Sequence, residues 1–245
     1  MVTCKLWAGA ANQLFMISAT ICHALRMNTS CAFPKKTINP KIWRTYIHNL
    51  PEVRPGYSTK NYFKQPDHSF TPIPDEQDIT LEGYFQSDKY WYAHKEQLGE
   101  ILRFEYKPAE YVAIHVRRGD YLLYADRFPV LPTAYYQTAI DYMTGEGHEL
   151  FRIFSDDIPW CKKFFGDSLI DPDFEYSIGK DPIQDIKDMF NAKAFIIANS
   201  TFSLFPALLR SDSPIVISPS EHRWFGPNGQ DMNSLDRLPD RFIKI

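Results

Sequence analysis

The strongest constraint on the fold is a repeated alternation of short apolar runs and amphipathic segments in the second half of the chain. The apolar runs have the length and residue content of buried strands, and they lie at residues 111–116, 151–154, 194–198 and 214–217. Helix-like segments between them begin near Pro132, Asp157, Asp181 and Phe205. Strand and helix units repeated in this way predict a parallel sheet with right-handed crossovers.

The first hundred residues predict a smaller set of elements. Residues 3–7 predict a short strand, and the small residues of 8–13 predict a turn. The helix expected next carries four apolar residues on one face, namely Leu14, Ile17, Ile21 and Leu25. Beyond it we expect loops and short elements over 33–78, a strand over 80–85 and a helix over 87–104.

A proline-bearing link at residues 104–110 predicts a boundary between two lobes. We therefore expect an N-terminal lobe of residues 1–106 and a second lobe of residues 107–225. The remaining residues, 226–245, form a C-terminal tail, for which packing back on the N-terminal lobe is one arrangement.

Composition and charge exclude several classes of protein. The 245 residues are 44% hydrophobic and 23% charged, which is ordinary for a globular protein. A formal charge of −3 leaves no basic footprint for nucleic acid, so we expect no nucleic-acid partner. No signal peptide or stop-transfer segment is apparent, and we expect a soluble chain without a membrane segment, with a removed anchor left open.

The cysteines indicate neither a metal site nor a disulfide framework. The four cysteines include no CxxC pair, and no histidines stand at zinc-like spacing from them. Cys22 and Cys161 fall in apolar, helix-like stretches, as buried free thiols usually do. We therefore expect a reducing compartment such as the cytoplasm.

Polar clusters directly follow three of the predicted strands. They are His115-Val-Arg-Arg-Gly-Asp120, Ser155-Asp156-Asp157 and Asn199-Ser-Thr-Phe-Ser203. Because the carboxyl ends of parallel strands meet at one edge of a sheet, we expect these clusters to converge there. Guanidinium groups match phosphate oxygens and stay charged, so Arg117 and Arg118 favour a phosphate-bearing substrate. The alternative is a surface turn whose charges are simply solvated.

These clusters, in this order, resemble the motifs of the α-1,2-fucosyltransferase family, with Trp160-Cys161 following the second of them. Ala11-Asn-Gln-Leu-Phe15 and Leu81-Glu-Gly-Tyr-Phe-Gln-Ser87 resemble that family too, so the likeness spans nearly the whole chain. The resemblance implies an α/β fold of the GT-B type: two Rossmann-like lobes with parallel sheets and a cleft between them. The N-terminal lobe would take the acceptor and the second lobe the nucleotide sugar.

The resemblance also implies an activity. An inverting fucosyltransferase would move L-fucose from GDP-L-fucose to a hydroxyl of a galactose-containing glycan, with α-1,2 linkage and without a metal or other cofactor. The implied donor-site residues are Asn12, Gln13, Arg117, Arg118, Asp156, Asp157, Ser200, Thr201, Phe202 and Ser203. The implied catalytic residues are Arg117, His115 and Asp120. In this scheme Arg117 holds the donor diphosphate with help from His115, and one of Asp156 and Asp157 accepts hydrogen bonds from guanine.

Inversion by direct displacement needs a base for the acceptor hydroxyl. Asp120 and His115 are the nearest candidates, and Glu82, Asp126 and Glu221 remain open. A salt bridge from Asp120 to an arginine would lower its pKa and weaken it as a base. Asp171-Pro-Asp173 matches the DxD pattern of metal-dependent transferases, but it lies in a proline-bearing stretch and we expect no metal there.

Two departures from the family pattern bear on the sugar. Trp7-Ala-Gly-Ala10 stands where the family usually has two glycines, and Ser203-Leu-Phe-Pro206 stands in place of Ser-Trp-Trp-Gly. The second departure could reshape the sugar pocket. A transferase for another GDP-sugar and a catalytically silent GDP- or glycan-binding relative are therefore alternatives. The sequence leaves the acceptor, the linkage, the base and the oligomeric state open.

Overall fold

A computed structural model describes residues 1–54, 56–166, 173–179, 181–229, 232 and 235–245. The chain forms two compact units. The first comprises Met1–Glu105 and a short segment ending at Arg237, and the second comprises Tyr106–Met232 and Leu238–Ile245. Both units are α/β with parallel sheets, which confirms the predicted fold class.

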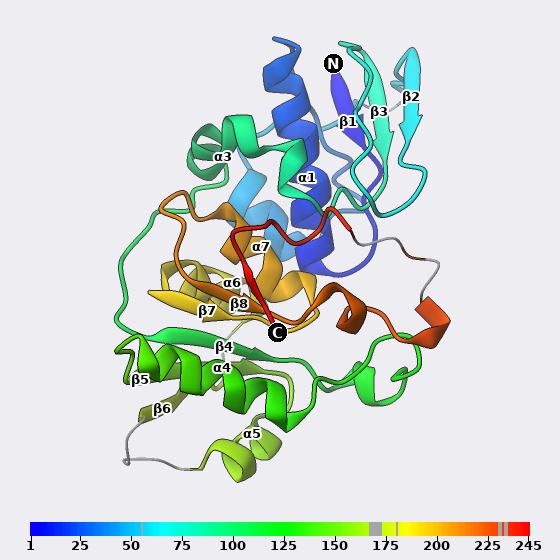
Figure 1. The fold of residues 1–245 in the computed structure, drawn as a ribbon. Coiled ribbons are helices and arrows are strands. Elements are labelled where there is room, and N and C mark those ends of the chain that lie inside the picture. Colours follow the sequence, from blue (N-terminus) through cyan, green and yellow to red (C-terminus); the bar gives the residue numbers. More distant parts are fainter. Residues whose placement is uncertain (55, 167–172, 180, 230–231, 233–234) are drawn as a thin grey trace. The chain divides into compact units, whose positions relative to one another are not determined.

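The first unit contains a three-stranded parallel sheet in the order β1-β3-β2. Its strands are β1 (Val2–Cys4), β2 (Asn61–Lys64) and β3 (Ile79–Glu82), and the long helix α1 (Ala10–Arg26) follows β1. Figure 1 shows α1 running beside this sheet. β1 is shorter than the predicted strand over 3–7, and the stretch 33–78 contains mostly short elements, as expected.

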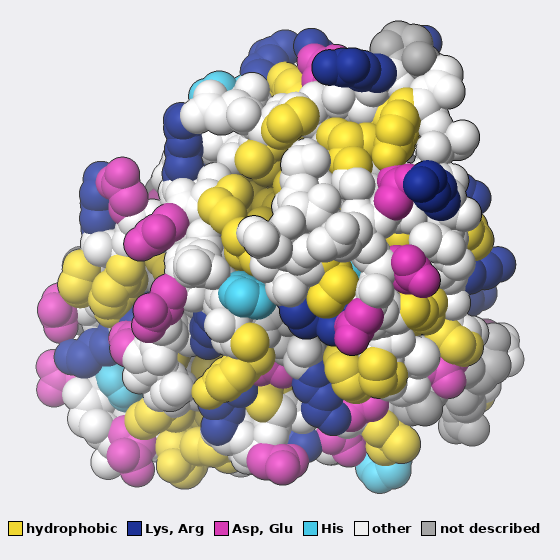
Figure 2. Space-filling view, turned by 90° about the horizontal axis from the view of Figure 1, so that it is seen from above, with side chains coloured by type: hydrophobic (Ala, Val, Ile, Leu, Met, Phe, Trp, Pro, Cys, Tyr) yellow, Lys and Arg dark blue, Asp and Glu magenta, His cyan; other side chains and the backbone are white. Residues whose placement is uncertain are grey.

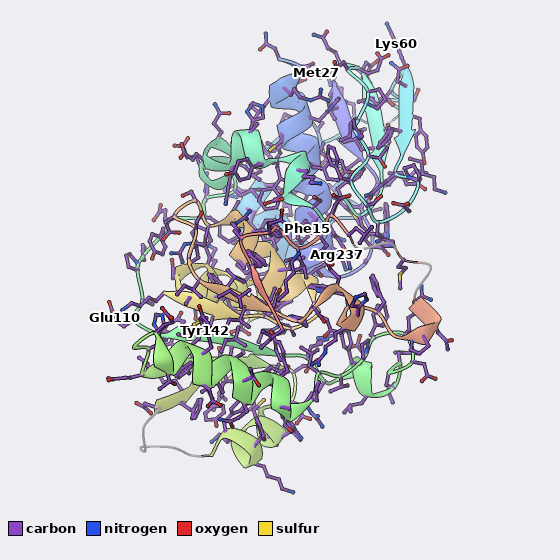
Figure 3. All side chains as sticks on the ribbon, in the orientation of Figure 1. Phe15, Met27, Lys60, Glu110, Tyr142 and Arg237 are labelled. Atoms are coloured by element: carbon purple, nitrogen blue, oxygen red, sulfur yellow. The ribbon has the colours of Figure 1, made fainter. Side chains whose placement is uncertain are left out.

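Helix α1 is buried around its whole middle section, where the sequence predicts only one apolar face. Leu14, Phe15, Met16 and Ile17 are consecutive and have no exposed surface. Phe15, labelled in Figure 3, packs edge-to-face against Trp91 with ring centroids 6.1 Å apart. Two buried hydroxyls of α1 donate to backbone carbonyls one turn earlier: Ser18 Oγ to Leu14 O at 2.7 Å and Thr20 Oγ1 to Met16 O at 2.7 Å. These two hydroxyls are therefore paired although they are buried.

The predicted helix over 87–104 is wrong in its first half. This stretch contains two single-turn 3-10 helices, Asp88–Tyr90 and Tyr92–His94, before α3 (Lys95–Ile101) begins. Trp91 stands between the two turns with φ −143° and is 1% exposed. Burying this indole against α1 takes the backbone out of the helical region, which is a tertiary constraint that local periodicity does not contain. A short α2 (Pro40–Ile42) and a π-helical turn (Trp43–Ile47) complete the helices described in this unit.

The second unit is a six-stranded parallel sheet in the order β6-β5-β4-β7-β8-β9. The strands are β4 (Val112–Val116), β5 (Leu150–Ser155), β6 (Asp173–Tyr176), β7 (Ala194–Ile196), β8 (Val216–Ser218) and β9 (Ile243–Lys244). The helices are α4 (Thr133–Gly145), α5 (Ile158–Phe165), α6 (Pro182–Asn191) and α7 (Thr201–Leu209). Every apolar run that the sequence marks as a strand in this half is one, with ends shifted by a few residues. The chain's last residues pair through β9 with β8.

Helix starts follow local capping chemistry. Asp157 accepts a hydrogen bond from Trp160 N at the start of α5, and Asp181 accepts one from Ile183 N at the start of α6, as predicted. Helix α7 begins at Thr201 and not near Phe205, because the Ser200 side chain accepts a hydrogen bond from Phe202 N.

The central strand β4 sends alternate side chains to opposite faces of the sheet. Val112, Ile114 and Val116 join a buried apolar cluster with residues of α4 and α5. His115 lies on the other face, where it contacts Ser203 of α7. Figure 1 shows α4 and α5 on one side of this sheet and α6 and α7 on the other. Phe154, which pairs with His115, is also buried, so His115 lies on a face that is otherwise largely apolar.

None of the helices among the described residues is both long and apolar enough to cross a bilayer. On the face drawn in Figure 2, acidic, basic and hydrophobic side chains are interspersed.

Two segments of the second unit are tied together at their backbones. Gly226 N donates to Arg127 O at 2.9 Å, and Asn228 N donates to Asp126 O at 2.9 Å. A Cβ at Gly226 would lie 2.3 Å from the backbone oxygen of Asp126. Only glycine allows this approach, so the loop that follows β4 depends on Gly226 for its position.

We predict that Gly226→Ala destabilises the protein by about 1–3 kcal/mol, because the added methyl group forces two backbones apart. The matched control is Gly99→Ala on α3, where an added Cβ meets nothing within 4 Å. The control should stabilise the helix by about 0.5–1 kcal/mol. Urea unfolding of both variants measures the difference, and equal effects would contradict the assigned role of Gly226.

Candidate functional site

The three polar clusters predicted from the sequence come together at one edge of the second unit's sheet. β4 lies between β5 and β7, with Val116 opposite Ser155 and Ile114 opposite Ile196. All three strands are parallel, so the residues after each strand emerge on the same edge. The convergence that the sequence predicts is therefore present.

Arg117 is held between two carboxylates. Its Nη1 lies 2.8 Å from Asp156 Oδ2, and its Nη2 lies 2.5 Å from Asp120 Oδ1. Its guanidinium also lies 5.3 Å from the centre of the Tyr121 ring. The Arg117 side chain is 31% exposed, so it is partly accessible to a ligand although both of its Nη atoms are paired.

Arg118 is fixed in a different way. Its Nε donates to Asp157 Oδ2 at 3.0 Å, and its guanidinium lies 4.0 Å from the centre of the Trp160 ring. The same Asp157 accepts a hydrogen bond from Trp160 N, 3.2 Å away, at the start of α5. Arg118, Asp157 and Trp160 thus form one packed group, in which the carboxylate is already engaged on both oxygens.

Asp156 links the first two clusters. Besides its contact with Arg117, it accepts a hydrogen bond from the backbone N of Arg118 at 2.9 Å. A Cβ at Gly119 would lie 2.6 Å from Asp156 Oδ2. Glycine at 119 is therefore what lets the Asp156 carboxylate reach under the turn after β4. Gly119 and Tyr121 lie inside or beside the first motif, but no residue pattern in the sequence marks either of them as a site residue.

His115 is buried and neutral. It is 3% exposed, and its Nδ1 lies 2.9 Å from Ser203 Oγ. Burial, and to a lesser extent the positive charge of Arg117, lowers the pKa of His115 to about 3. An imidazole with such a pKa is a poor base at neutral pH, so His115 acts in this geometry as a neutral hydrogen-bonding group that joins β4 to α7.

The third cluster forms the start of α7. Ser200 caps the helix, and Thr201 and Phe202 are partly exposed at its first turn. Phe202 also packs against the His115 ring, with centroids 5.3 Å apart. Backbone N–H groups at the start of a helix favour an anion. Ser203, in contrast, is 1% exposed and its hydroxyl is engaged with His115.

Asn199 ties this turn to the neighbouring loops. Its Nδ2 donates to Pro129 O at 2.9 Å and to Arg223 O at 3.1 Å. The backbone carbonyl of Asn199 accepts a hydrogen bond from Tyr121 Oη at 3.0 Å. Tyr121 therefore joins Arg117, which lies over its ring, to the turn before α7.

Asn12 and Gln13 belong to the first unit, on α1. Gln13 is 4% exposed, and its side chain is used within that unit: Oε1 accepts from Asn39 N at 2.7 Å and Nε2 donates to Thr37 O at 3.2 Å. Asn12 is partly exposed and accepts a hydrogen bond from Gln86 Nε2 at 2.5 Å. The Gln13 amide thus holds the loop at 37–39.

The remaining base candidates differ in how firmly they are paired. Neighbouring Lys5 and Tyr62 lower the pKa of Glu82 to about 2, which makes it a weak base. Glu221 pairs with Lys244 at 2.8 Å. Asp126 is exposed. Asp120 is 54% exposed and paired only at its Arg117 side, so its carboxylate is the most accessible of those at the strand edge.

The described residues bear on the DxD match and on the departure from the family pattern at residues 204–205. Among them, no group of three or more His, Cys, Asp and Glu side chains could hold a metal ion. Asp171 of the DxD match lies outside the described residues. Leu204 and Phe205, which replace two family tryptophans, have no exposed surface. Their departure from the family pattern therefore falls in the packing of α7.

The buried His115 predicts a pH dependence of stability. Its ordinary pKa is 6.5 and its folded pKa is about 3. Between these values the unfolded chain binds a proton that the folded chain does not, so the free energy of unfolding falls as the pH falls. Between about pH 7 and pH 4, the free energy of unfolding should therefore fall less in His115→Gln than in the wild type. Urea unfolding across that range measures it, and identical pH dependence in both proteins would refute the assignment.

Comparison with known proteins identifies the family. A model described as Glycosyl transferase family 11 matches residues 25–224. An α-1,2-colitosyltransferase of Escherichia coli is 33% identical over 185 residues, which cover 68% of this chain and 62% of that protein. A galactoside 2-α-L-fucosyltransferase SEC1 of Bos taurus is 31% identical over 123 residues, covering 46% of this chain and 32% of that protein.

The fold has a counterpart among solved structures. The NodZ α-1,6-fucosyltransferase soaked with GDP-fucose superposes with a TM-score of 0.54 at 12% identity, covering 91% of this chain and 96% of that one. At this identity the likeness concerns the fold alone. The chain spans less than two thirds of the length of the two relatives compared by sequence. Because the family match extends over most of its residues, the chain belongs to glycosyltransferase family 11.

Proposed function

We propose that this chain transfers L-fucose from GDP-L-fucose to a hydroxyl of a galactoside, with α-1,2 linkage, inversion and no required metal. The observation that carries the proposal is Arg117, a partly exposed guanidinium fixed by Asp156 at the convergence of three strand ends. Membership of glycosyltransferase family 11 supports the reaction class, and the relatives' names include an α-1,2-colitosyltransferase and a galactoside 2-α-L-fucosyltransferase.

The charge of the site dictates how a diphosphate would bind. Two guanidiniums face three carboxylates, so the cluster carries a formal charge of −1 before a donor arrives. An incoming diphosphate therefore has to replace one carboxylate. Asp120 is the one to leave, since it is 54% exposed and exposed ion pairs contribute little stability. Asp156 stays, because it also accepts the Arg118 backbone N–H.

This exchange supplies the base that the reaction needs. When the diphosphate takes the place of Asp120 on Arg117, the Asp120 carboxylate is free to accept the proton of the acceptor hydroxyl. That oxygen then forms a bond to the anomeric carbon while the bond from this carbon to the β-phosphate oxygen breaks. Arg117, already oriented by Asp156, stabilises the negative charge that develops on GDP. In this proposal the start of α7 adds to the binding of the same phosphates, because the N-terminus of a helix favours an anion.

A second candidate is the transfer of another GDP-linked sugar. The colitosyltransferase relative, at 33% identity, favours it, because its name gives a donor sugar other than fucose. A third candidate is a silent GDP- or glycan-binding relative. The second and third candidates use the same nucleotide site as the leading proposal. The second transfers a different sugar, and the third transfers none.

Arg117→Ala should lower the rate of transfer by about 100-fold or more, as expected when a fixed donor to the developing charge is removed. Arg127→Ala is the matched control: it lies on the same loop, is exposed, and its guanidinium contacts only Met232 Sδ and the Phe128 ring among the described residues. The control should keep wild-type transfer. Circular dichroism and thermal unfolding verify that both variants fold. Full activity in a folded Arg117→Ala variant would remove the central assignment.

The donor, the stereochemistry and the metal requirement can be tested in one assay. Labelled GDP-fucose is incubated with a panel of β-galactosides, with and without EDTA, and in competition with GDP-mannose. We expect transfer that a chelator does not reduce, a product with inverted anomeric configuration by proton NMR, and preference for GDP-fucose. Activity lost to EDTA and restored by Mg²⁺ or Mn²⁺ would contradict metal independence. Tight GDP binding without turnover on any galactoside would favour the silent relative.

A further inference from the structure

Three partly exposed aromatic residues follow the three parallel strands of the first unit. Trp7 follows β1, His68 follows β2 and Tyr84 follows β3, so they gather at the carboxyl edge of this small sheet. The Trp7 and Tyr84 rings meet edge-to-face with centroids 5.4 Å apart, and the His68 and Tyr84 rings stack at 5.0 Å. We call these three residues the aromatic shelf.

The shelf differs from the aromatic core of the same unit. Trp91 and Phe85 are at most 1% exposed and fill space between elements. Trp7, His68 and Tyr84 keep part of their surface in solvent although they already touch one another. Partly exposed rings gathered at the carboxyl end of parallel strands are typical of a binding surface.

Two of the five described non-glycine residues with positive φ adjoin the shelf. Ala8, directly after Trp7, has φ 61°, and Phe85, directly after Tyr84, has φ 51°. Residues other than glycine seldom adopt this left-handed region, which costs about 1 kcal/mol or more for each of them. Such strain persists where the surrounding structure holds a conformation for a purpose, and here it sets the direction of two of the three shelf residues.

Gln65 holds the two loops that carry Tyr84 and His68. It is 7% exposed, its Oε1 accepts a hydrogen bond from Phe85 N at 2.9 Å, and its Nε2 donates to Ser69 O at 2.9 Å. A Cβ at Gly83 would lie 2.5 Å from the Gln65 Cβ, so glycine is required there. The shelf is therefore organised before any ligand binds, which lowers the entropy cost of binding.

We propose that the aromatic shelf binds the acceptor sugar, a β-galactoside, through stacking of its pyranose ring on Trp7, with Tyr84 standing edge-to-face beside the indole. Galactose has an axial C4 hydroxyl, which leaves one face of its ring lined by C–H bonds, and that face is complementary to an aromatic ring. The indole N–H of Trp7 and the hydroxyl of Tyr84 supply polar groups at the edges of the rings. This inference rests on the proposed function and names the residues that would hold its acceptor.

The test separates the acceptor from the donor. Trp7→Ala should raise the KM for lactose or methyl β-galactoside about ten-fold, which corresponds to about 1.4 kcal/mol of lost binding energy. Trp7→Phe, which keeps an aromatic face, should restore most of the affinity. The KM for GDP-fucose should stay at the wild-type value in both variants. Tyr92→Ala, a 63% exposed tyrosine of the same unit outside the shelf, is the matched control and should change neither constant.

A second measurement does not depend on catalysis. Saturation-transfer NMR with methyl β-galactoside in the absence of donor should show contact to the C–H face of the ring in the wild type and lose it in Trp7→Ala. An unchanged acceptor KM together with an unchanged NMR signal in folded Trp7→Ala would overturn the shelf. Failure of the proposed function looks different: wild-type protein would neither bind GDP nor transfer fucose, whatever the galactoside titration shows.

Discussion

The contact on which the candidate site depends is the Asp156 carboxylate reaching across from β5 to the turn after β4. It accepts from Arg117 Nη1 at 2.8 Å and from the Arg118 backbone N at 2.9 Å. Neighbouring parallel strands bring the two segments within reach, and the missing side chain at Gly119 leaves room for the carboxylate. Without this contact Arg117 would be paired only with the exposed Asp120 among the described residues. The contact orients the Arg117 guanidinium and holds the backbone of the turn after β4 through the Arg118 N–H.

The side chains of the motif at 115–120 differ in burial and in charge pairing, and these differences give them different roles. His115 is removed from water and stays neutral, so it adds no charge beside Arg117 and serves to join β4 to α7. Arg118 is stacked on Trp160 and paired with Asp157, which makes it part of the wall of the site. Arg117 and Asp120 keep exposed surface, at 31% and 54% of their side chains, so this ion pair is the one in the cluster that solvent reaches most.

The first unit shows how the same sheet geometry produces a different surface. Beyond its three strand ends lie the rings of Trp7, His68 and Tyr84, and its loops are held by Gln65 and by left-handed backbone at Ala8 and Phe85. The charges at these strand ends, Lys5, Lys64 and Glu82, pair with one another. Guanidinium groups match phosphate oxygens, whereas partly exposed rings match the C–H face of a sugar.

The sequence by itself determined four of the six strands described in the second unit (β4, β5, β7 and β8), its helices apart from the start of α7, the helix caps at Asp157 and Asp181, and the convergence of three polar clusters on one edge. These follow from period, capping chemistry and the rule that parallel strands end together, all of which are local or topological. Tertiary structure alone decided that α1 is buried all round, that the chain breaks at Trp91, and that His115 is neutral. It also decided that Leu204 and Phe205 lie in the core and that Trp7, His68 and Tyr84 form a row. Each of these features depends on which side chains, distant in the sequence, pack around a residue and exclude water from it. The burial that results cannot be read from the residue's neighbours in the sequence.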